Sequence, residues 1–292
     1  MKENQIYAGK EMGQNFLSNP ETARMIVEQT GIDSHARVLE IGPGLGALTI
    51  PIAQKTRHIT VVEKDRRLIP LLVQALERHG IDWVRVMNQD FLKTDITTLA
   101  DGQKLVVMGN LPYNISSQIL FRLIRSRGLI DRAYLMFQRE LADRILATPG
   151  NKAYSRLSVV SQYAAKIRRK IDIGPGAFFP KPAVDSTVLS FDFFSSRPFS
   201  GDMELLLFTV IKAAFSKRRK SLKNSLVGAD LGLDKSTVVK ALAGAGIVPE
   251  RRAETLSVAE FEALTRAVDP FIKNEQDNLR LDTMNGWNNG KE

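Results

Sequence analysis

The chain has 292 residues, 43% of them hydrophobic, and a formal net charge of +9 at pH 7. This length suggests two domains, the composition is that of a globular protein, and the positive charge hints at a polyanionic partner. The absence of cysteine excludes disulfides, thiolate metal sites and thiol nucleophiles.

The positions of the histidines and the lengths of the apolar runs argue against two further classes, zinc proteins and membrane-spanning proteins. The three histidines, His35, His58 and His79, are scattered and form no His-x-x-x-His pair, so we expect neither a zinc site nor a histidine general base. No apolar run approaches the ~18 residues of a membrane span, and no apolar signal core follows Met1–Gln5. We therefore expect a cytoplasmic protein with no metal and no membrane partner.

The first predicted helix covers about residues 21–30. Asn19 is its expected N-cap, Pro20 its first helical residue and Gly31 its stop. The polar segment before it, Gly13-Gln14-Asn15-Phe16-Leu17, has no structural need for Asn15. This segment is either a flexible arm or a lid over a binding site.

A nucleotide-binding unit follows, with a strand at 37–41, a glycine-rich turn and a helix at about 47–55. Gly42 and Gly44 permit a tight turn and a close approach of ligand to backbone. The next strand, 59–63, ends in Glu63, 21 residues after Gly42, where a carboxylate can accept bonds from both ribose hydroxyls. The pattern predicts an adenosine-containing ligand, either a nicotinamide cofactor or S-adenosylmethionine. Pro43 lacks the N–H that a pyrophosphate would use, which favours the second.

A helix at about 65–78, ended by Gly80, leads to a third strand at 83–87. Asp90 and Phe91 then reach the same edge of the sheet. Asp90 can accept a hydrogen bond from an adenine amino group, with Phe91 beside the ring. The alternative is that Asp90 is an ordinary loop or cap residue.

The stretch Gly109-Asn110-Leu111-Pro112-Tyr113-Asn114 is the centre of the prediction. It follows an apolar strand at 104–108 and precedes a helix at about 115–124, which places it at the carboxyl end of a strand, where open α/β sheets bind ligands. Asn110 offers an amide oxygen, Pro112 a carbonyl without an N–H, and Tyr113 a flat ring. Two acceptors beside a ring suit a planar group with an exocyclic NH2. A plain strand-to-helix turn is the alternative.

The remaining elements complete a first domain at 1–195 and a helical second domain at 196–272. In the first domain we expect strands at 132–137, 166–173 and 188–194, the last closing the sheet, helices opening at 138 and at 155, and a stiff loop at 178–186 that presents Phe178 and Phe179. In the second we expect helices at 202–226, 236–243 and from the capping box Ser257-x-x-Glu260 to before Pro270. Residues 273–292 are expected to be a disordered tail.

A basic run, Lys217-Arg218-Arg219-Lys220, lies on the predicted helix 202–226. Such runs are often solvated helix faces. This one has almost no acids interleaved, and a second group, Lys166, Arg168, Arg169 and Lys170, lies on a strand-like segment. We favour a footprint on a phosphate backbone, which gives affinity rather than choice of sequence.

These motifs together resemble the ribosomal RNA adenine dimethyltransferases, and most closely the branch that acts on small-subunit RNA. The matching stretches span about residues 7–270 in order: 13–17, 40–44, Glu63, Asp90, 110–113, 179–186 and 215–220. The resemblance implies an α/β, Rossmann-like methyltransferase core with a helical C-terminal domain. It also implies contacts to S-adenosylmethionine at Asn15, Leu17, Gly42, Glu63, Asp90 and Asn110.

The function implied by this resemblance is N6,N6-dimethylation of two adjacent adenosines in the 3′-terminal hairpin of 16S rRNA, by a monomer acting on the pre-small subunit. Asn110 and Pro112 would accept the adenine N6–H bonds, and Tyr113 and Phe179 would stack on the base. Three alternatives remain at this point: a nicotinamide-dependent oxidoreductase, a non-catalytic ribosome assembly factor, and a large-subunit rRNA adenine methyltransferase. The Met12 position and the tail after Lys273 depart from the family pattern.

Overall fold

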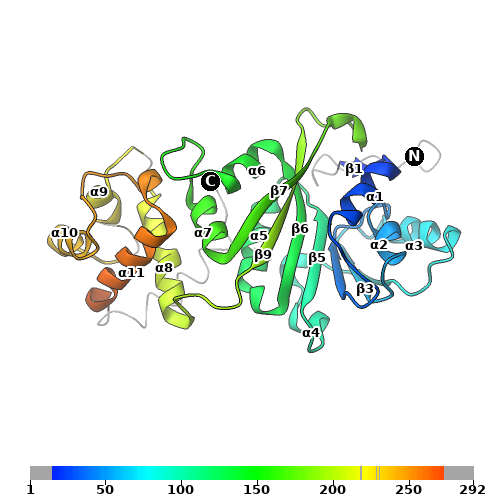
Figure 1. Ribbon diagram of the computed structural model, residues 1–292, viewed down its shortest axis with the longest axis horizontal. Helices are drawn as coiled ribbons and strands as arrows, with labels where there is room; N and C mark the ends of the chain where they lie inside the picture. Colours follow the sequence, from blue (N-terminus) through cyan, green and yellow to red (C-terminus); the bar gives the residue numbers. More distant parts are fainter. Residues whose placement is uncertain (1–14, 218, 228, 230, 273–292) are drawn as a thin grey trace. The chain divides into compact units, whose positions relative to one another are not determined.

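The computed structural model describes residues 15–272 apart from 218, 228 and 230 (Figure 1). The chain divides into two compact units, one with residues up to Ala142 and Ala165–Phe194, the other with Asp143–Ala164 and the chain from Ser195. The stretch 143–164 therefore departs from the predicted domain 1–195. It groups with the C-terminal helices because Tyr163 packs edge-to-face on Phe208, with ring centroids 5.9 Å apart. The predicted tail, 273–292, lies outside the described residues.

The first unit is built on a seven-stranded mixed sheet with strand order β4-β3-β2-β5-β6-β9-β7. Its strands are β2 (Val38–Ile41), β3 (Ile59–Glu63), β4 (Arg85–Asn88), β5 (Leu105–Asn110), β6 (Ile130–Gln138), β7 (Ala165–Ile173) and β9 (Ser186–Phe193). Its helices are α1 (Pro20–Glu28), α2 (Thr49–Ala53), α3 (Ile69–Arg78), α4 (Thr97–Ala100) and α5 (Ser116–Arg125), and α6 (Arg139–Leu146) begins there. The α/β fold class is as expected, since apolar strands alternate with helical segments along the chain.

The direction in which successive strands are added to the sheet reverses at β2. This strand pairs in parallel with β3 on one side and with β5 on the other. This reversal makes the carboxyl ends of β2 and β5 the point where open α/β sheets bind ligands. Helices α1, α2 and α3 cover one face of these strands through a core that includes Ile26, Ile52 and Leu72. The loop after β2 and the end of β5 are thus held on a rigid, buried sheet.

The last strand in sequence, β9, lies inside the sheet and not at its edge, which corrects the predicted position of strand 188–194. It is antiparallel to β6 on one side and to β7 on the other. Burial explains the order, because the first six residues of β9 are buried whereas most of β7 is not. The basic group of β7 therefore lies on an edge strand, where charged side chains discourage pairing with another chain.

A separate two-stranded ribbon joins segments far apart in sequence. Strand β1 (Phe16–Leu17) pairs antiparallel with β8 (Phe178–Phe179), and the Ser18 N–H donates to the Ala177 carbonyl at 2.8 Å. The segment before α1 is therefore anchored from Asn15 on, while Gly13 and Gln14 lie outside the described residues. The ribbon places Phe16, the neighbour of Asn15, opposite Phe179.

The second unit is helical, as predicted, with helices α7 (Arg156–Ala164), α8 (Gly201–Ala214), α9 (Leu222–Leu226), α10 (Lys235–Gly244) and α11 (Val258–Ile272). The capping box is confirmed, because the Glu260 carboxylate accepts from the Ser257 N–H at 2.8 Å and the Ser257 hydroxyl from the Glu260 N–H at 3.2 Å. Helix α11 continues past Pro270, against expectation, because Ile272 beyond it is buried.

The single helix predicted at 202–226 is wrong, since α8 ends at Ala214 and a second helix begins at Leu222. Two tertiary contacts break it. The Phe215 ring stacks on Phe261 with centroids 5.9 Å apart, and the Leu222 N–H donates to the Arg251 carbonyl at 2.7 Å. Lys217, Arg219 and Lys220 consequently lie in the connection between two helices, and all three are exposed.

Candidate functional site

The site lies where the sheet order reverses, and three glycines shape it. Gly42 and Gly44 have φ of 66° and 56°, in the left-handed region that other residues rarely adopt. A Cβ on Gly44 would lie 3.0 Å from the Phe16 ring. Glycine is required at position 109 for a different reason. A Cβ on Gly109 would lie 2.7 Å from the Ile41 carbonyl oxygen, so only glycine lets β5 approach β2 this closely. The sequence singled out the first two, whereas the close approach of Gly109 appears only in the sheet.

Glu63 ends β3 with its carboxylate fixed by backbone donors. The Gly44 N–H donates to Oε2 at 3.1 Å and the Asp65 N–H to Oε1 at 2.8 Å. Burial raises the pKa of Glu63, and these N–H bonds offset part of the rise. A carboxylate has about four lone-pair sites, so two bonds leave room for two hydroxyl donors. The geometry therefore suits the predicted ribose contact.

Asp90 and Phe91 lie beyond β4, on the neighbouring side of the same edge. The Asp90 carboxylate accepts from the Leu92 N–H at 3.0 Å and forms an ion pair with Lys64 at 2.9 Å. Burial alone would raise the pKa of Asp90, but Lys64 and the Leu92 N–H outweigh it and lower that pKa. Neither residue lines the pocket that holds Glu63 and Asn110. Asp90 is thus both a cap of the short helix Phe91–Lys93 and an ionised acceptor beside the site.

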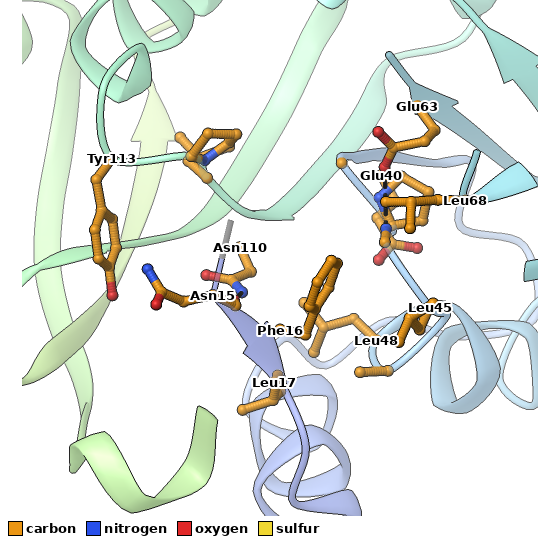
Figure 2. A pocket seen from close by; sticks show the side chains of 16 residues that line it. Asn15, Phe16, Leu17, Glu40, Leu45, Leu48, Glu63, Leu68, Asn110 and Tyr113 are labelled. Atoms are coloured by element: carbon orange, nitrogen blue, oxygen red, sulfur yellow. Dashed lines mark hydrogen bonds between the residues drawn. The ribbon is translucent and has the colours of Figure 1, made fainter. Parts of the chain in front are cut away.

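Asn110, the last residue of β5, is oriented by the segment before α1. Its Nδ2 donates to the Asn15 carbonyl at 2.9 Å, which leaves its Oδ1 as an acceptor for another donor. Figure 2 shows Asn110 and Tyr113 on one side of the pocket and Glu63 and Glu40 on the other, with Phe16 between them. Of the two readings of the Asn15 segment, the arrangement supports the one in which it covers the site.

Pro112 and Tyr113 follow Asn110 in the loop before α5. The Pro112 carbonyl accepts from the Ile115 N–H at 3.2 Å, and its second lone pair remains for another donor. The Tyr113 hydroxyl lies 3.0 Å from the Ser186 hydroxyl at the start of β9. Burial raises the pKa of Tyr113, with partial relief from Ser186, so Tyr113 stays a neutral phenol at pH 7. The ring is held from both ends, by the backbone and by Ser186, which sequence reasoning did not assign to the site.

Phe179 is the second predicted stacking residue, and it is placed differently. It belongs to β8 and is 49% exposed, whereas its neighbour Phe178 is buried in the core. Alternation along the strand separates the two rings, so one packs and the other faces solvent. A large exposed aromatic on a ribbon that also carries the segment next to Asn15 is available to a base.

Glu40 is a pocket residue that the sequence analysis missed. It lies on β2, two residues before Gly42, is 1% exposed and lines the pocket. Its Oε2 is buried without a hydrogen-bond partner in the described part of the chain. Burial raises the pKa of Glu40 to about 8, Thr49 offsets this in part, and the Glu63 charge adds to it. A buried acid in a strand is unexpected in the core, and that is the signal that could have identified it.

The two predicted groups of basic residues differ in their surroundings. On β7, Arg168 is paired with Asp192, and Arg169 with Asp172 at 3.0 Å, so these two charges are partly neutralised. Lys217, Arg219 and Lys220 are exposed in the connection after α8, and Arg218 lies outside the described residues. The predicted phosphate footprint therefore rests on a loop and not on a helix face.

The residues around the pocket fit an adenosine-containing cofactor with a cationic head. Backbone glycines allow close approach, Glu63 has free lone pairs for hydroxyls, and Glu40 presents an unpartnered carboxylate oxygen that a positive group would stabilise. Within the described residues, no group of three or more His, Asp or Glu side chains is placed to hold a metal ion. No helix in the described ranges is long and apolar enough to cross a membrane.

Comparisons with known proteins show which family the chain resembles. The family profile for ribosomal RNA adenine dimethylase matches residues 7–266. A ribosomal RNA small subunit methyltransferase A from Desulforapulum autotrophicum is 55% identical, over 92% of this chain and 94% of that protein. One from Syntrophotalea carbinolica is 43% identical, over 90% and 97%. The crystal structure of a dimethyladenosine transferase from Plasmodium falciparum has a TM-score of 0.71 and 27% identity, over 85% of this chain and 95% of that one.

Proposed function

Because the chain belongs to the ribosomal RNA adenine dimethylase family, we propose that the crevice at the ends of β2 and β5 methylates adenines of small-subunit rRNA. Family membership decides between the two adenosine-containing cofactors in favour of S-adenosylmethionine. The target we propose is a pair of adjacent adenosines in the 3′-terminal hairpin of 16S rRNA, each receiving two methyl groups.

Cofactor contacts are proposed for the residues that the sequence singled out. Glu63 would accept the ribose hydroxyls, Asp90 and Phe91 would lie at the adenine, and Gly42 and Gly44 would allow the methionine portion to approach the backbone. Asn15 and Leu17 would cover the cofactor from the segment before α1. The support is that the pocket lining includes Asn15, Leu17, Gly42, Gly44 and Glu63.

The reaction depends more on the positioning of the reacting groups than on a strong base. S-adenosylmethionine supplies an electrophilic methyl group on a sulfonium. Adenine N6 is a poor nucleophile because its lone pair is delocalised into the ring. If the Asn110 Oδ1 and the Pro112 carbonyl accept the two N6–H bonds, they favour a pyramidal nitrogen with its lone pair free. Such preorganised electrostatics and alignment contribute several kcal/mol in enzymes generally.

The target base must leave its stack to reach these acceptors, and we propose Tyr113 and Phe179 for its two faces. Stacking on an aromatic side chain contributes about 1–3 kcal/mol per base. Tyr113 is neutral and tethered to Ser186, so its ring is already oriented. The second methylation retains one N6–H, which a single one of the two acceptors can hold.

The observation that carries the proposal is the position of Asn110. Its side chain lines the pocket, and its Nδ2 is held by the Asn15 carbonyl, which leaves Oδ1 as an acceptor. An acceptor at the end of β5, at the sheet's reversal point, is what an exocyclic NH2 needs.

The test is transfer of labelled methyl from S-adenosylmethionine to under-methylated small ribosomal subunits, followed by nucleoside digestion. N6,N6-dimethyladenosine in the 3′-terminal hairpin is the expected product. Tight subunit binding without transfer would indicate an assembly factor instead. Transfer to large-subunit RNA alone would contradict the proposed substrate.

A further inference from the structure

The three histidines, scattered in sequence, come together at the opposite edge of the sheet from the cofactor site. They line a hollow of about 600 Å³ at the amino ends of β2, β3 and β4, whose lining is Ser34, His35, Ala53, Gln54, Lys55, Thr56, Arg57, His58, His79, Ile81 and Trp83. These are all the histidines of the chain. Each comes from a different connection, because β2, β3 and β4 are parallel neighbours and their amino ends meet at one edge.

The hollow is cationic. Lys55 and Arg57 are exposed in it, and its described lining contains no Asp or Glu. Asp33 and Asp82 are each adjacent in sequence to a lining segment. The Asp33 carboxylate is used within its own turn, accepting from the N–H groups of His35 and Ala36 at 3.0 Å each. Two permanent charges and three imidazoles thus face one concave surface.

An aromatic ring positions one of these charges. The Arg57 guanidinium lies over the Trp83 indole, 4.8 Å from its centroid. Stacking of this kind fixes the plane of a guanidinium while its N–H donors stay free at the rim. His79 is also oriented, since its Nδ1 lies 2.8 Å from the Ala75 carbonyl and Nε2 remains for another partner. The side chains of Arg57 and His79 are therefore held in fixed orientations, unlike a freely rotating surface lysine.

A metal ion does not explain the cluster. Among the described residues, no three His, Asp or Glu side chains are close enough to share an ion. Donors in a concave, positively charged surface instead suit phosphate oxygens, for which Arg forks and Lys ammonium groups are the usual partners in proteins.

We propose that this hollow is a second RNA-binding site, which holds the phosphate backbone of a duplex segment away from the adenine being methylated. The inference rests on the proposed function, because that function supplies a large folded RNA as the substrate. Phosphate contacts of this kind fix orientation and add affinity without reading sequence.

The test measures binding of a short labelled RNA duplex of unrelated sequence to the full-length protein by fluorescence anisotropy, from 50 to 200 mM salt. The variant carries Lys55→Gln and Arg57→Gln; the charge-matched control carries Lys104→Gln and Arg125→Gln, two exposed residues outside the lining. Each lost phosphate contact reduces the salt slope by about 0.9, so the variant should be shallower by about 1.8 and the control unchanged. Equal slopes in variant and control would overturn the inference.

Methyl transfer by the wild type is measured in parallel: its absence counts against the proposed function, whereas transfer with unaltered slopes counts against the hollow alone.

Discussion

The two edges of the central sheet are opposite in chemistry. At the carboxyl edge, the pocket presents oxygen atoms: those of the Glu40 and Glu63 carboxyl groups and the amide oxygen of Asn110. At the amino edge, the hollow presents Lys55, Arg57 and three imidazoles. The same strands pass from one edge to the other, so the difference comes from the loops that the strands position.

This contrast teaches how one scaffold can separate two kinds of recognition. An acceptor-rich, buried edge suits a cofactor with a positive sulfonium and a base with an exocyclic NH2. A donor-rich, exposed edge suits phosphates. Because burial strengthens electrostatics and exposure to salt weakens it, changes at the first edge should be larger than changes at the second.

The largest effect is expected for Glu40→Gln, which should change how the free energy of unfolding depends on pH. The pKa of Glu40 in the folded protein is about 8, above its value of 4.5 in an unfolded chain, so the folded state holds a proton that the unfolded state has lost. Stability of the wild type should fall as pH rises from about 5 to 8, at about 1.4 kcal/mol per pH unit, or at most about 5 kcal/mol.

Thermal denaturation of the cofactor-free protein across this pH range gives the measurement. The Glu40→Gln protein should show a flatter profile than the wild type. Identical profiles would mean that Glu40 titrates as an exposed acid and that the carboxyl edge is not desolvated. Added S-adenosylmethionine should reduce the pH dependence of the wild type, because its positive charge stabilises the carboxylate.

The next largest effect is expected for Asn110→Ala, on turnover. Removal of one preorganised hydrogen-bonding group at a reacting centre typically costs about 10²–10³ in kcat. The fold should persist, since Asn110 is only partly buried. Single-turnover transfer to under-methylated small subunits is the assay, with Asn114→Ala, an exposed residue of the same loop, as the matched control. Unchanged dimethylation by the Asn110 variant would remove this residue from the mechanism.

The exposed basic run in the second unit provides a reference for the salt dependence expected of the amino-edge hollow. Changing Lys217, Arg219 and Lys220 to Gln should weaken subunit binding and reduce the salt slope by up to about 2.7, about 0.9 for each phosphate contact. Lys152, Lys235 and Lys240, exposed in the same unit, form the charge-matched control. If both triple variants respond alike, the run is a solvated surface and net charge alone explains the binding.

The smallest effect is expected for the tether between Tyr113 and Ser186. Loss of one such hydrogen bond costs about 1 kcal/mol, or roughly fivefold, and should appear as a higher KM for the subunit with kcat largely kept. Tyr113→Phe and Ser186→Ala remove the same bond, so the double variant should be no worse than either single one. Ser190→Ala, a buried serine on the same strand, is the control. Additive losses would show that the two residues act separately.

Local sequence was sufficient to predict much of this protein. The N-cap at Asn19, the glycine turn at Gly42, the acid at Glu63 and the loop after Asn110 depend on neighbours within a few residues. Backbone conformation and alternation of apolar side chains fix such features, and both can be read from the chain.

Other features were decided only by tertiary contacts. The sequence pattern continues through 202–226, but Phe215 packing on Phe261 and the Leu222 N–H bonding to Arg251 divide that helix. Ser186 meets Tyr113 across 73 residues, and His35, His58 and His79 meet across three connections. Such contacts depend on which strands become neighbours, and no local propensity carries that information. The sequence by itself therefore determined which candidate groups are present, and the packed sheet determined which of them lie together.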